Sequence, residues 1–205
     1  MARAVSTLWV DFPDVRDEYA ALWSEMVIHE DKVADVDWTV ARIIGDKEAY
    51  LNIERRTSVP WFVVAVIHSL EAGGDFSRHL HNGDPLTART VNVPEGRPPD
   101  GEPPFSWEDS AVDALEIDGL NAETDWSVQH VAYCLEGFNG WGYREYHSEV
   151  KSPYLWSFSN HYVCGKYVAD GTWDGTAVSA QCGAMVLLRR LQDAGEIELV
   201  VADYN

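Results

Sequence analysis

A glutamate stands at the end of the most apolar segment of the chain. Residues 61–70 are almost wholly apolar, and Glu71 follows them directly before Ala72 and the pair Gly73-Gly74. A carboxyl group held against apolar side chains has a raised pKa, because burial disfavours its charged form. Such a group can act as a general acid at neutral pH. The sequence therefore offers Glu71 as a proton donor, and an exposed glutamate without a catalytic role is the alternative.

A second carboxylate could activate a water molecule beside such an acid. The candidates lie in the polar stretch after Glu71, and they are Asp75, Asp84, Glu95 and Asp100. Asp84 is favoured because Asn82-Gly83 and Asp84-Pro85 are both turn-forming pairs, which can hold a carboxylate rigidly over the end of a helix. Asp before Pro is also a frequent turn former, so a purely structural role for Asp84 stays open.

Other kinds of catalytic site find little support in the sequence. His68, His79 and His81 are potential zinc ligands, but the chain has no helical histidine pair at four-residue spacing, so we expect no metal and no cofactor. The Gly-x-Ser-x-Gly element of serine hydrolases and the phosphate-binding loop motifs are both missing. The widely spaced Cys134, Cys164 and Cys182 are expected to be reduced thiols.

Hydrophobic periodicity predicts a mainly helical protein around these residues. Apolar side chains recur at three- and four-residue steps, which is typical of helices with one buried face. The segment at residues 61–71 is apolar on nearly all faces and is expected to be a central helix. The other predicted helices cover residues 14–29, 31–44, 46–56, 106–120, 125–138 and 177–194.

Two segments lack a helical period. Residues 76–104 are rich in Gly, Pro, Asn, Asp and Thr, which predicts a long loop or a small β-hairpin flap, with Val91–Val93 as a short strand at most. Such loops usually bind ligands or cover sites, and a disordered tract over residues 95–104 is the alternative. Residues 139–175 are dense in aromatic rings, which can stack on sugars, although most rings belong to a core.

The charge of the chain limits its partners. Its 205 residues carry a formal net charge of −19, from 15 basic and 34 acidic side chains. Nucleic acid is not an expected partner, because binding phosphates requires clustered Lys and Arg. The charge suits a neutral or cationic polymer such as chitin or chitosan, but a solvated acidic surface that keeps the protein in solution is the favoured explanation. Residues 1–15 contain only a short apolar stretch, so we expect neither a signal peptide nor membrane insertion.

Two segments resemble parts of enzymes that cleave amino-sugar polymers. The run Ile67–Phe76 is similar to the catalytic-helix end of the lysozyme superfamily, and the run Leu135–Tyr143 is similar to the aromatic-Asn-small-Gly substrate segment of lytic transglycosylases and goose-type lysozymes. With residues 152–156 and 165–171, the pattern resembles lysozyme-like proteins of bacteria and phages over residues 50–191. A Gly-Leu-Met-Gln stretch does not follow the loop as it does in typical transglycosylases, so the reaction outcome stays open.

The resemblance implies a role for each candidate residue. Glu71 would protonate the glycosidic oxygen, and Asp84 would prepare a water molecule on the other face of the sugar. Thr90, six residues after Asp84, resembles the threonine that helps to hold this water in phage-type inverting lysozymes. The candidates for substrate binding are Asn139, Tyr143, Tyr154, Tyr162 and His68. His68 lies one turn before Glu71 and is expected to pack beside the acid or to form a hydrogen bond with it.

We therefore expect a mainly α, lysozyme-like fold with a long loop or small β-hairpin flap beside a central helix. Residues 1–205 are expected to form one catalytic domain, with an N-terminal helical part at residues 1–56 and a catalytic core at residues 57–205. We also expect a monomer that is made in the cytoplasm and acts on cell wall or extracellular polymer after its release, as a phage-encoded enzyme would.

The expected function is hydrolysis of a β-1,4-linked amino-sugar polymer by general acid catalysis from Glu71. Peptidoglycan is the first candidate substrate, and chitin or chitosan is the second. Transglycosylase chemistry is a further alternative, because the acetamido group of the substrate can replace a second carboxylate. A non-catalytic carbohydrate-binding or virion protein with the same fold is the alternative from a different class.

Overall fold

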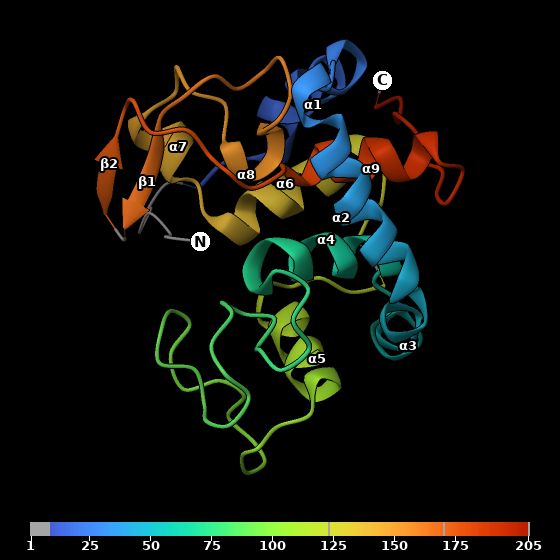
Figure 1. Cartoon of the computed structure of the whole chain (residues 1–205), viewed down its shortest axis with the longest axis vertical. Helices are drawn as coiled ribbons and strands as arrows, with labels where there is room; N and C mark the ends of the chain where they lie inside the picture. Colours follow the sequence, from blue (N-terminus) through green and yellow to red (C-terminus); the bar gives the residue numbers. More distant parts are fainter. Residues whose placement is uncertain (1–8, 123, 170, 205) are drawn as a thin grey trace. The chain divides into compact units, whose positions relative to one another are not determined.

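The computed structural model describes residues 9–122, 124–169 and 171–204. Its contacts divide the chain into two compact units. The first unit contains the segments up to Val40 and from Asp125 onward, and the second contains Ala41–Thr124. Helices are the main regular structure of both units, and a two-stranded antiparallel sheet accompanies them in the described residues (Figure 1). The predicted mainly α class is confirmed.

The second unit is built on helix α4 (Trp61–Ala72). Helices α3 (Lys47–Thr57) and α5 (Trp107–Ile117) complete the unit, and α3 packs against both of the others. Most of α4 is buried, including all side chains of residues 63–67, so the prediction of a helix that is apolar on nearly all faces is confirmed. Burial of one large aliphatic side chain contributes about 1.5–3 kcal/mol, which makes α4 a main source of stability for this unit.

The ends of these helices follow local sequence signals. The Ser106 side chain caps α5 by accepting a hydrogen bond from the backbone N–H of Asp109. Helix α4 stops at Gly73 and Gly74, which both have positive φ angles of 63° and 72°, and the Gly74 N–H donates to the His68 carbonyl at 3.2 Å. No helix in the described part of the chain is both long and apolar enough to cross a membrane.

The segment between α4 and α5 is irregular, as predicted. It contains one isolated antiparallel bridge, between Arg78 and Pro85, and otherwise runs as loops and turns beside α5 (Figure 1). Residues 91–93, which were expected to form a short strand at most, form none, and Val91 and Val93 are exposed. Their β-branched side chains favour extended structure, but a strand also requires a hydrogen-bonded neighbour.

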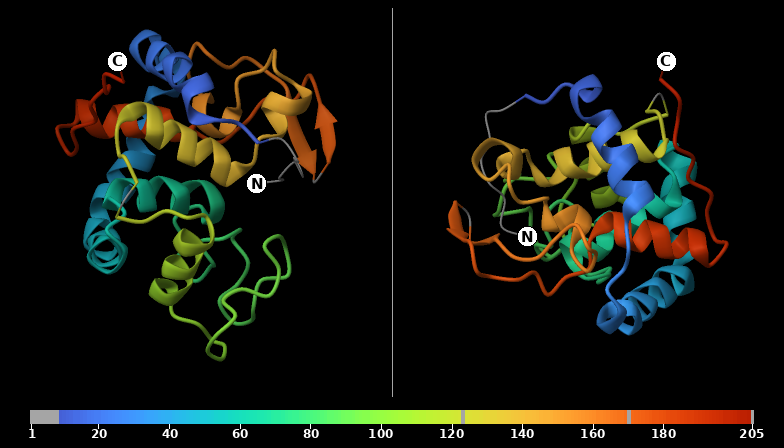
Figure 2. Two further views of the ribbon diagram at one scale, coloured as in Figure 1. Left: turned by 180° about the vertical axis from the view of Figure 1, so that it is seen from behind. Right: turned by 90° about the horizontal axis from the view of Figure 1, so that it is seen from above.

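The first unit is a helical bundle with a small sheet. Helix α1 (Phe12–Glu25) packs along α6 (Val128–Asn139), and α8 (Pro153–Trp156) contacts both α6 and α9 (Ala184–Asp193) (Figure 2). Gly183 allows the last of these contacts, since a Cβ there would lie 2.4 Å from the Leu155 carbonyl oxygen. The remaining elements of this unit are a 3₁₀ turn (Glu30–Lys32), α7 (Gly142–Tyr146), β1 (Lys166–Ala169) and β2 (Thr172–Asp174). Helix α2 (Val33–Gly45) belongs to the first unit up to Val40 and to the second from Ala41.

Several predicted boundaries differ from the observed ones. The helix expected at residues 14–29 ends at Glu25, because Met26 is extended, and the helix expected from residue 177 begins only at Ala184. The short helices α7 and α8 were not predicted. The predicted division after residue 56 falls at the last residue of α3, and α3 and α4 pack on each other within one unit. That residues 1–205 form one catalytic domain stays a prediction.

Candidate functional site

Glu71 lies at the end of α4 in the second unit. Its side chain is 8% exposed and therefore does not project into open solvent. The turn at Gly83 lies directly on the backbone of Glu71, because a Cβ at residue 83 would be 2.4 Å from the Glu71 carbonyl oxygen. The Asn-Gly turn that the sequence placed near the helix end is therefore in contact with the candidate acid residue.

Two short backbone hydrogen bonds hold this turn in a narrow hairpin. The His79 N–H donates to the Asp84 carbonyl at 2.7 Å, and the Gly83 N–H donates to the His79 carbonyl at 2.9 Å. The guanidinium of Arg78 donates to the Gly83 carbonyl at 2.8 Å and to the Asp75 carboxylate at 3.2 Å. The hairpin thus fixes the position of Asp84 relative to the end of α4.

The Asp84 carboxylate is engaged by the loop that follows it. Its Oδ2 accepts the backbone N–H groups of Val91 at 2.8 Å and Asn92 at 2.9 Å, and its Oδ1 accepts the Asn92 side-chain amide at 2.6 Å. Burial raises the pKa of Asp84, but these hydrogen bonds outweigh burial and the pKa is lowered. The observed role of Asp84 is to shape the loop, and its part in water activation stays a prediction.

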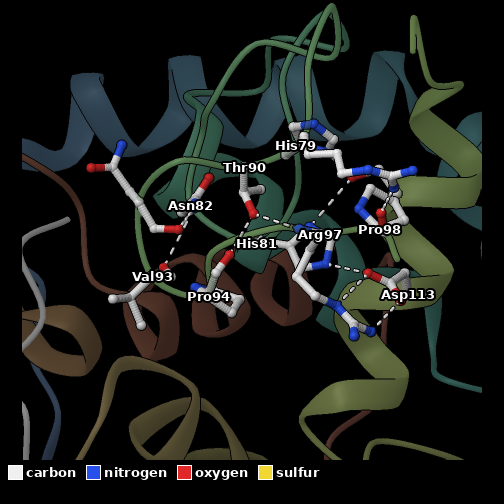
Figure 3. Close-up of polar contacts among 12 residues, drawn as sticks. His79, His81, Asn82, Thr90, Val93, Pro94, Arg97, Pro98 and Asp113 are labelled. Atoms are coloured by element: carbon white, nitrogen blue, oxygen red, sulfur yellow. Dashed lines mark hydrogen bonds and ion pairs between the residues drawn. The ribbon is translucent and has the colours of Figure 1, made fainter. Parts of the chain in front are cut away.

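Thr90 is also used within the loop. Its side chain is 2% exposed, and its hydroxyl donates to the Pro94 carbonyl at 2.5 Å and accepts the Arg97 N–H at 2.9 Å (Figure 3). The hydroxyl therefore has one donor and one acceptor inside the protein. The implied role of Thr90 in holding an attacking water is not favoured by this arrangement.

A buried polar network connects the loop to α5. His81 Nε2 lies 2.8 Å from Asp113 Oδ2, and the Arg97 guanidinium binds the same carboxylate (Figure 3). Ser110 lies between the rings of His79 and His81, with its Oγ 2.8 Å from His79 Nδ1 and 3.5 Å from His81 Nδ1. Burial lowers the pKa of His81 to about 4, against the effect of Asp113, so this histidine is neutral at neutral pH.

This network contains the Ser, His and Asp side chains of a nucleophilic triad, but its arrangement supports the fold and not catalysis. Ser110 is completely buried, so its hydroxyl has no access to a substrate. Among the described residues, no group of three or more His, Cys, Asp or Glu side chains is arranged to hold a metal ion. No local sequence pattern indicates this network, because His81 and Asp113 are 32 residues apart.

His68 lies in an aromatic cluster of the second unit. It is completely buried, its Nδ1 lies 3.0 Å from the Tyr50 hydroxyl, and its ring packs on Phe76 and Trp107. Burial lowers the pKa of His68 to about 4. The expected role in substrate binding is therefore corrected, because the side chain has no surface for a substrate to touch.

Asn139 and Tyr143 share a pocket in the first unit. The cavity has a volume of about 310 Å³, and its other lining residues are Pro153, Lys166, Tyr167, Val168, Ser179, Ala180 and Gln181. Asn139 is 4% exposed, and its Oδ1 has no hydrogen-bond partner in the described chain. A buried amide oxygen without a partner costs about 1–3 kcal/mol, so this atom needs an explanation such as a bound ligand. The two residues that the resemblance linked are thus brought together.

Two other predicted sugar-stacking residues are in the core of the first unit. Tyr154 is completely buried, and Tyr162 is nearly so. The Tyr162 hydroxyl accepts the Ser179 N–H at 3.1 Å and donates to the Gly165 carbonyl at 3.3 Å. Neither ring has a face open to a sugar, so these two assignments are corrected.

A buried ion-pair network was missed by sequence reasoning. Glu136 is buried in α6, and its Oε2 accepts hydrogen bonds from the Tyr19 hydroxyl at 2.5 Å and from Arg144 at 2.9 and 3.1 Å. Burial raises the pKa of Glu136, although Arg144 opposes this. Tyr19 and Glu136 are 117 residues apart, so no local pattern could have joined them.

No protein-family model, curated protein or solved structure matches this chain.

Replacement of Gly83 by alanine is expected to destabilise the second unit. Gly83 and Gly96 have nearly equal positive φ angles of 78° and 77°, but a Cβ at residue 96 meets nothing within 4 Å. Gly96→Ala therefore controls for backbone strain, and Gly83→Ala should cost about 1–3 kcal/mol more because of the clash with Glu71. Urea unfolding followed by circular dichroism measures the difference. Equal losses in the two variants would refute the contact.

Replacement of Asp84 distinguishes its structural role from a catalytic one. Asp84→Ala removes the acceptor of three hydrogen bonds and is expected to cost about 2 kcal/mol of stability. Asp84→Asn keeps an acceptor for the backbone N–H groups. Its stability and its turnover should therefore be closer to those of the wild type than to those of Asp84→Ala. Urea unfolding and turnover are measured for both variants. A stable Asp84→Asn protein that has lost turnover would instead support a catalytic carboxylate.

The stability of the protein is expected to fall in mild acid because of His68. Its pKa is about 4 in the folded state and 6.5 ordinarily, so the unfolded chain binds the proton first as the pH falls. The contribution is complete above pH 6.5 and is lost between about pH 6.5 and 4, by roughly 2–3 kcal/mol. Unfolding free energies measured from pH 7 to 4.5 should fall less steeply in His68→Gln than in the wild type. Parallel curves would contradict the assignment.

Proposed function

We propose that the protein is a glycosidase that cleaves a β-1,4-linked amino-sugar polymer, with Glu71 as general acid. The observation that carries the proposal is the placement of Glu71, which is 8% exposed where the buried helix α4 ends under the Gly83 turn. A general acid must hold its proton until the leaving oxygen needs it, and shielding a carboxyl group from bulk water favours the protonated form.

The pocket at Asn139 and Tyr143 supports an amino-sugar substrate. An amide oxygen can accept a hydrogen bond from the acetamido N–H or from a hydroxyl group of a sugar ring. The volume of about 310 Å³ lies at the lower end of the range for small-ligand sites, which is about 300–1,000 Å³. Peptidoglycan is the first candidate polymer, and chitin or chitosan is the second. Both provide acetylated or free amino groups on a β-1,4-linked backbone.

The environment of Asp84 favours a mechanism without a second carboxylate. Its two oxygens accept three hydrogen bonds from Val91 and Asn92, which leaves it poorly placed to take a proton from water. In a transglycosylase reaction, the acetamido group of the substrate assists departure of the leaving group, and an internal hydroxyl then closes an anhydro ring. The contacts of Asp84 favour this outcome, and hydrolysis with Asp84 as base is the alternative that analysis of the products would test.

Replacement of Glu71 by glutamine is expected to reduce turnover at least about hundredfold, because general acid catalysis contributes about 10²–10⁴-fold. Stability should change little, since glutamine keeps the shape of the side chain. Glu48→Gln, an exposed change on α3, is the matched control and should leave turnover unchanged. Labelled cell walls and glycol chitin are the substrates, and mass spectrometry of the products separates anhydro ends from reducing ends.

Two outcomes would overturn the proposal. Full turnover in Glu71→Gln would exclude this residue as the acid. Binding without turnover by the wild-type protein on both polymers would favour a carbohydrate-binding protein instead.

A further inference from the structure

The pocket of the first unit differs in charge from its surroundings. Among the lining residues that the structure describes, Lys166 is the one charged side chain, and none carries a carboxylate. A cavity of about 380 Å³ in the second unit shows the contrast, because Asp100, Glu102, Asp109, Asp113 and Glu116 all line it with one arginine. In a chain with a net charge of −19, a pocket with a lysine and no acid is distinctive.

The ammonium group of Lys166 has no ion pair within the described chain. Lys166 lies on β1 opposite Asp174 on β2, and this aspartate would be its natural partner. The Asp174 carboxylate is instead used by the next turn, where its Oδ1 accepts the backbone N–H of Thr176 at 2.8 Å, the Thr176 hydroxyl at 2.8 Å and the Ala177 N–H at 3.2 Å. These bonds lower the pKa of Asp174 and keep it at its own turn. The positive charge of Lys166 is therefore available to a ligand in the pocket that this residue lines.

Asn139 is a second polar feature of the pocket, which Ser179 and Gln181 also line. The Asn139 Oδ1 is a buried acceptor without a hydrogen-bond partner in the described chain, so a donor group on a ligand could satisfy it. Tyr143 and Tyr167 add aromatic surface to the same pocket, and the Tyr167 N–H donates to the Tyr143 hydroxyl at 3.4 Å. The pocket therefore combines an acceptor, an apolar wall and one cation.

We propose that this pocket selects amino-sugar units that carry a carboxylate, with Lys166 as the residue that determines specificity. An amide N–H or hydroxyl group of the sugar donates a hydrogen bond to Asn139 Oδ1, and the carboxylate of the sugar binds the Lys166 ammonium group. This inference rests on the proposed function and narrows its substrate to acid-bearing amino-sugar polymers over neutral or cationic ones. The acidic surface of the chain repels anionic polymers at long range, so recognition of such a polymer requires a local cation.

Binding of two monosaccharides to the full chain with the change Glu71→Gln tests this proposal without turnover. N-acetylmuramic acid and N-acetylglucosamine share the acetamido sugar, and they differ by one carboxylate-bearing ether group. Titrations followed by NMR should show tighter binding of the acid, and Lys166→Gln should weaken this binding about fivefold, as expected for a partly exposed ion pair, without changing that of the neutral sugar. Added salt should reduce the preference.

Control variants separate charge from folding. Lys32→Gln removes the same charge from the same unit outside the pocket and should change neither affinity. Asn139→Leu should weaken both sugars equally, since both would use the amide. Circular dichroism verifies that each variant is folded.

Three results would overturn the inference. They are equal binding of the two sugars by the parent protein, equal weakening of both by Lys166→Gln, and no binding of either sugar at millimolar concentration. Because binding is measured in a variant that lacks the proposed acid, these results are independent of turnover. If Lys166→Gln loses the preference for N-acetylmuramic acid but the wild-type protein cleaves neither polymer, the proposed function is refuted. The inference about the pocket then still holds.

Discussion

The contact between the Gly83 turn and the end of α4 is the constraint on which the second unit depends. A helix end leaves carbonyl groups without partners inside the helix, and the chain must cover them or leave them to water. Here Gly73 and Gly74 reverse the chain, and Gly83 then lies against the Glu71 carbonyl with no side chain between them. Because backbone meets backbone, the loop closes on the helix and Glu71 stays largely buried.

An irregular loop of this length must satisfy its backbone groups without a sheet, and it does so with side chains. Asp84 holds the backbone at Val91 and Asn92, and Thr90 joins Pro94 to Arg97. A carboxylate that accepts several N–H bonds is well suited to this task, because those bonds keep it ionised and fixed. The same bonds make it a poor base, so the stability of the loop and a catalytic use of Asp84 compete for one pair of oxygens.

Features that depend on local signals could be predicted from the sequence, and features that depend on contacts between distant segments could not. Helices α3, α4, α5 and α6 were predicted within a few residues because periodicity, caps and glycine stops act locally. The pairing of Asn139 with Tyr143 in one pocket was also within reach, since both belong to one short segment. The burial of Tyr154 and His68 was not, because an aromatic ring in a polar stretch is compatible with a core or a surface, and only contacts from distant segments decide between them. The Glu136 network depends on Tyr19, which is far away in the chain.

The distribution of cations completes this picture. In the described chain, most basic side chains that approach a pocket or a core are held by acids, as Arg144 is by Glu136 and Glu18, Lys151 by Glu18, and Arg97 by Asp113. Lys166 departs from this pattern because Asp174, its partner across the two strands, accepts hydrogen bonds from the following turn. Screening limits the reach of surface charge to about 8–10 Å in physiological salt, so a single lysine at a pocket wall acts only on a ligand already in place. Its charge therefore contributes to selecting the ligand and little to attracting it.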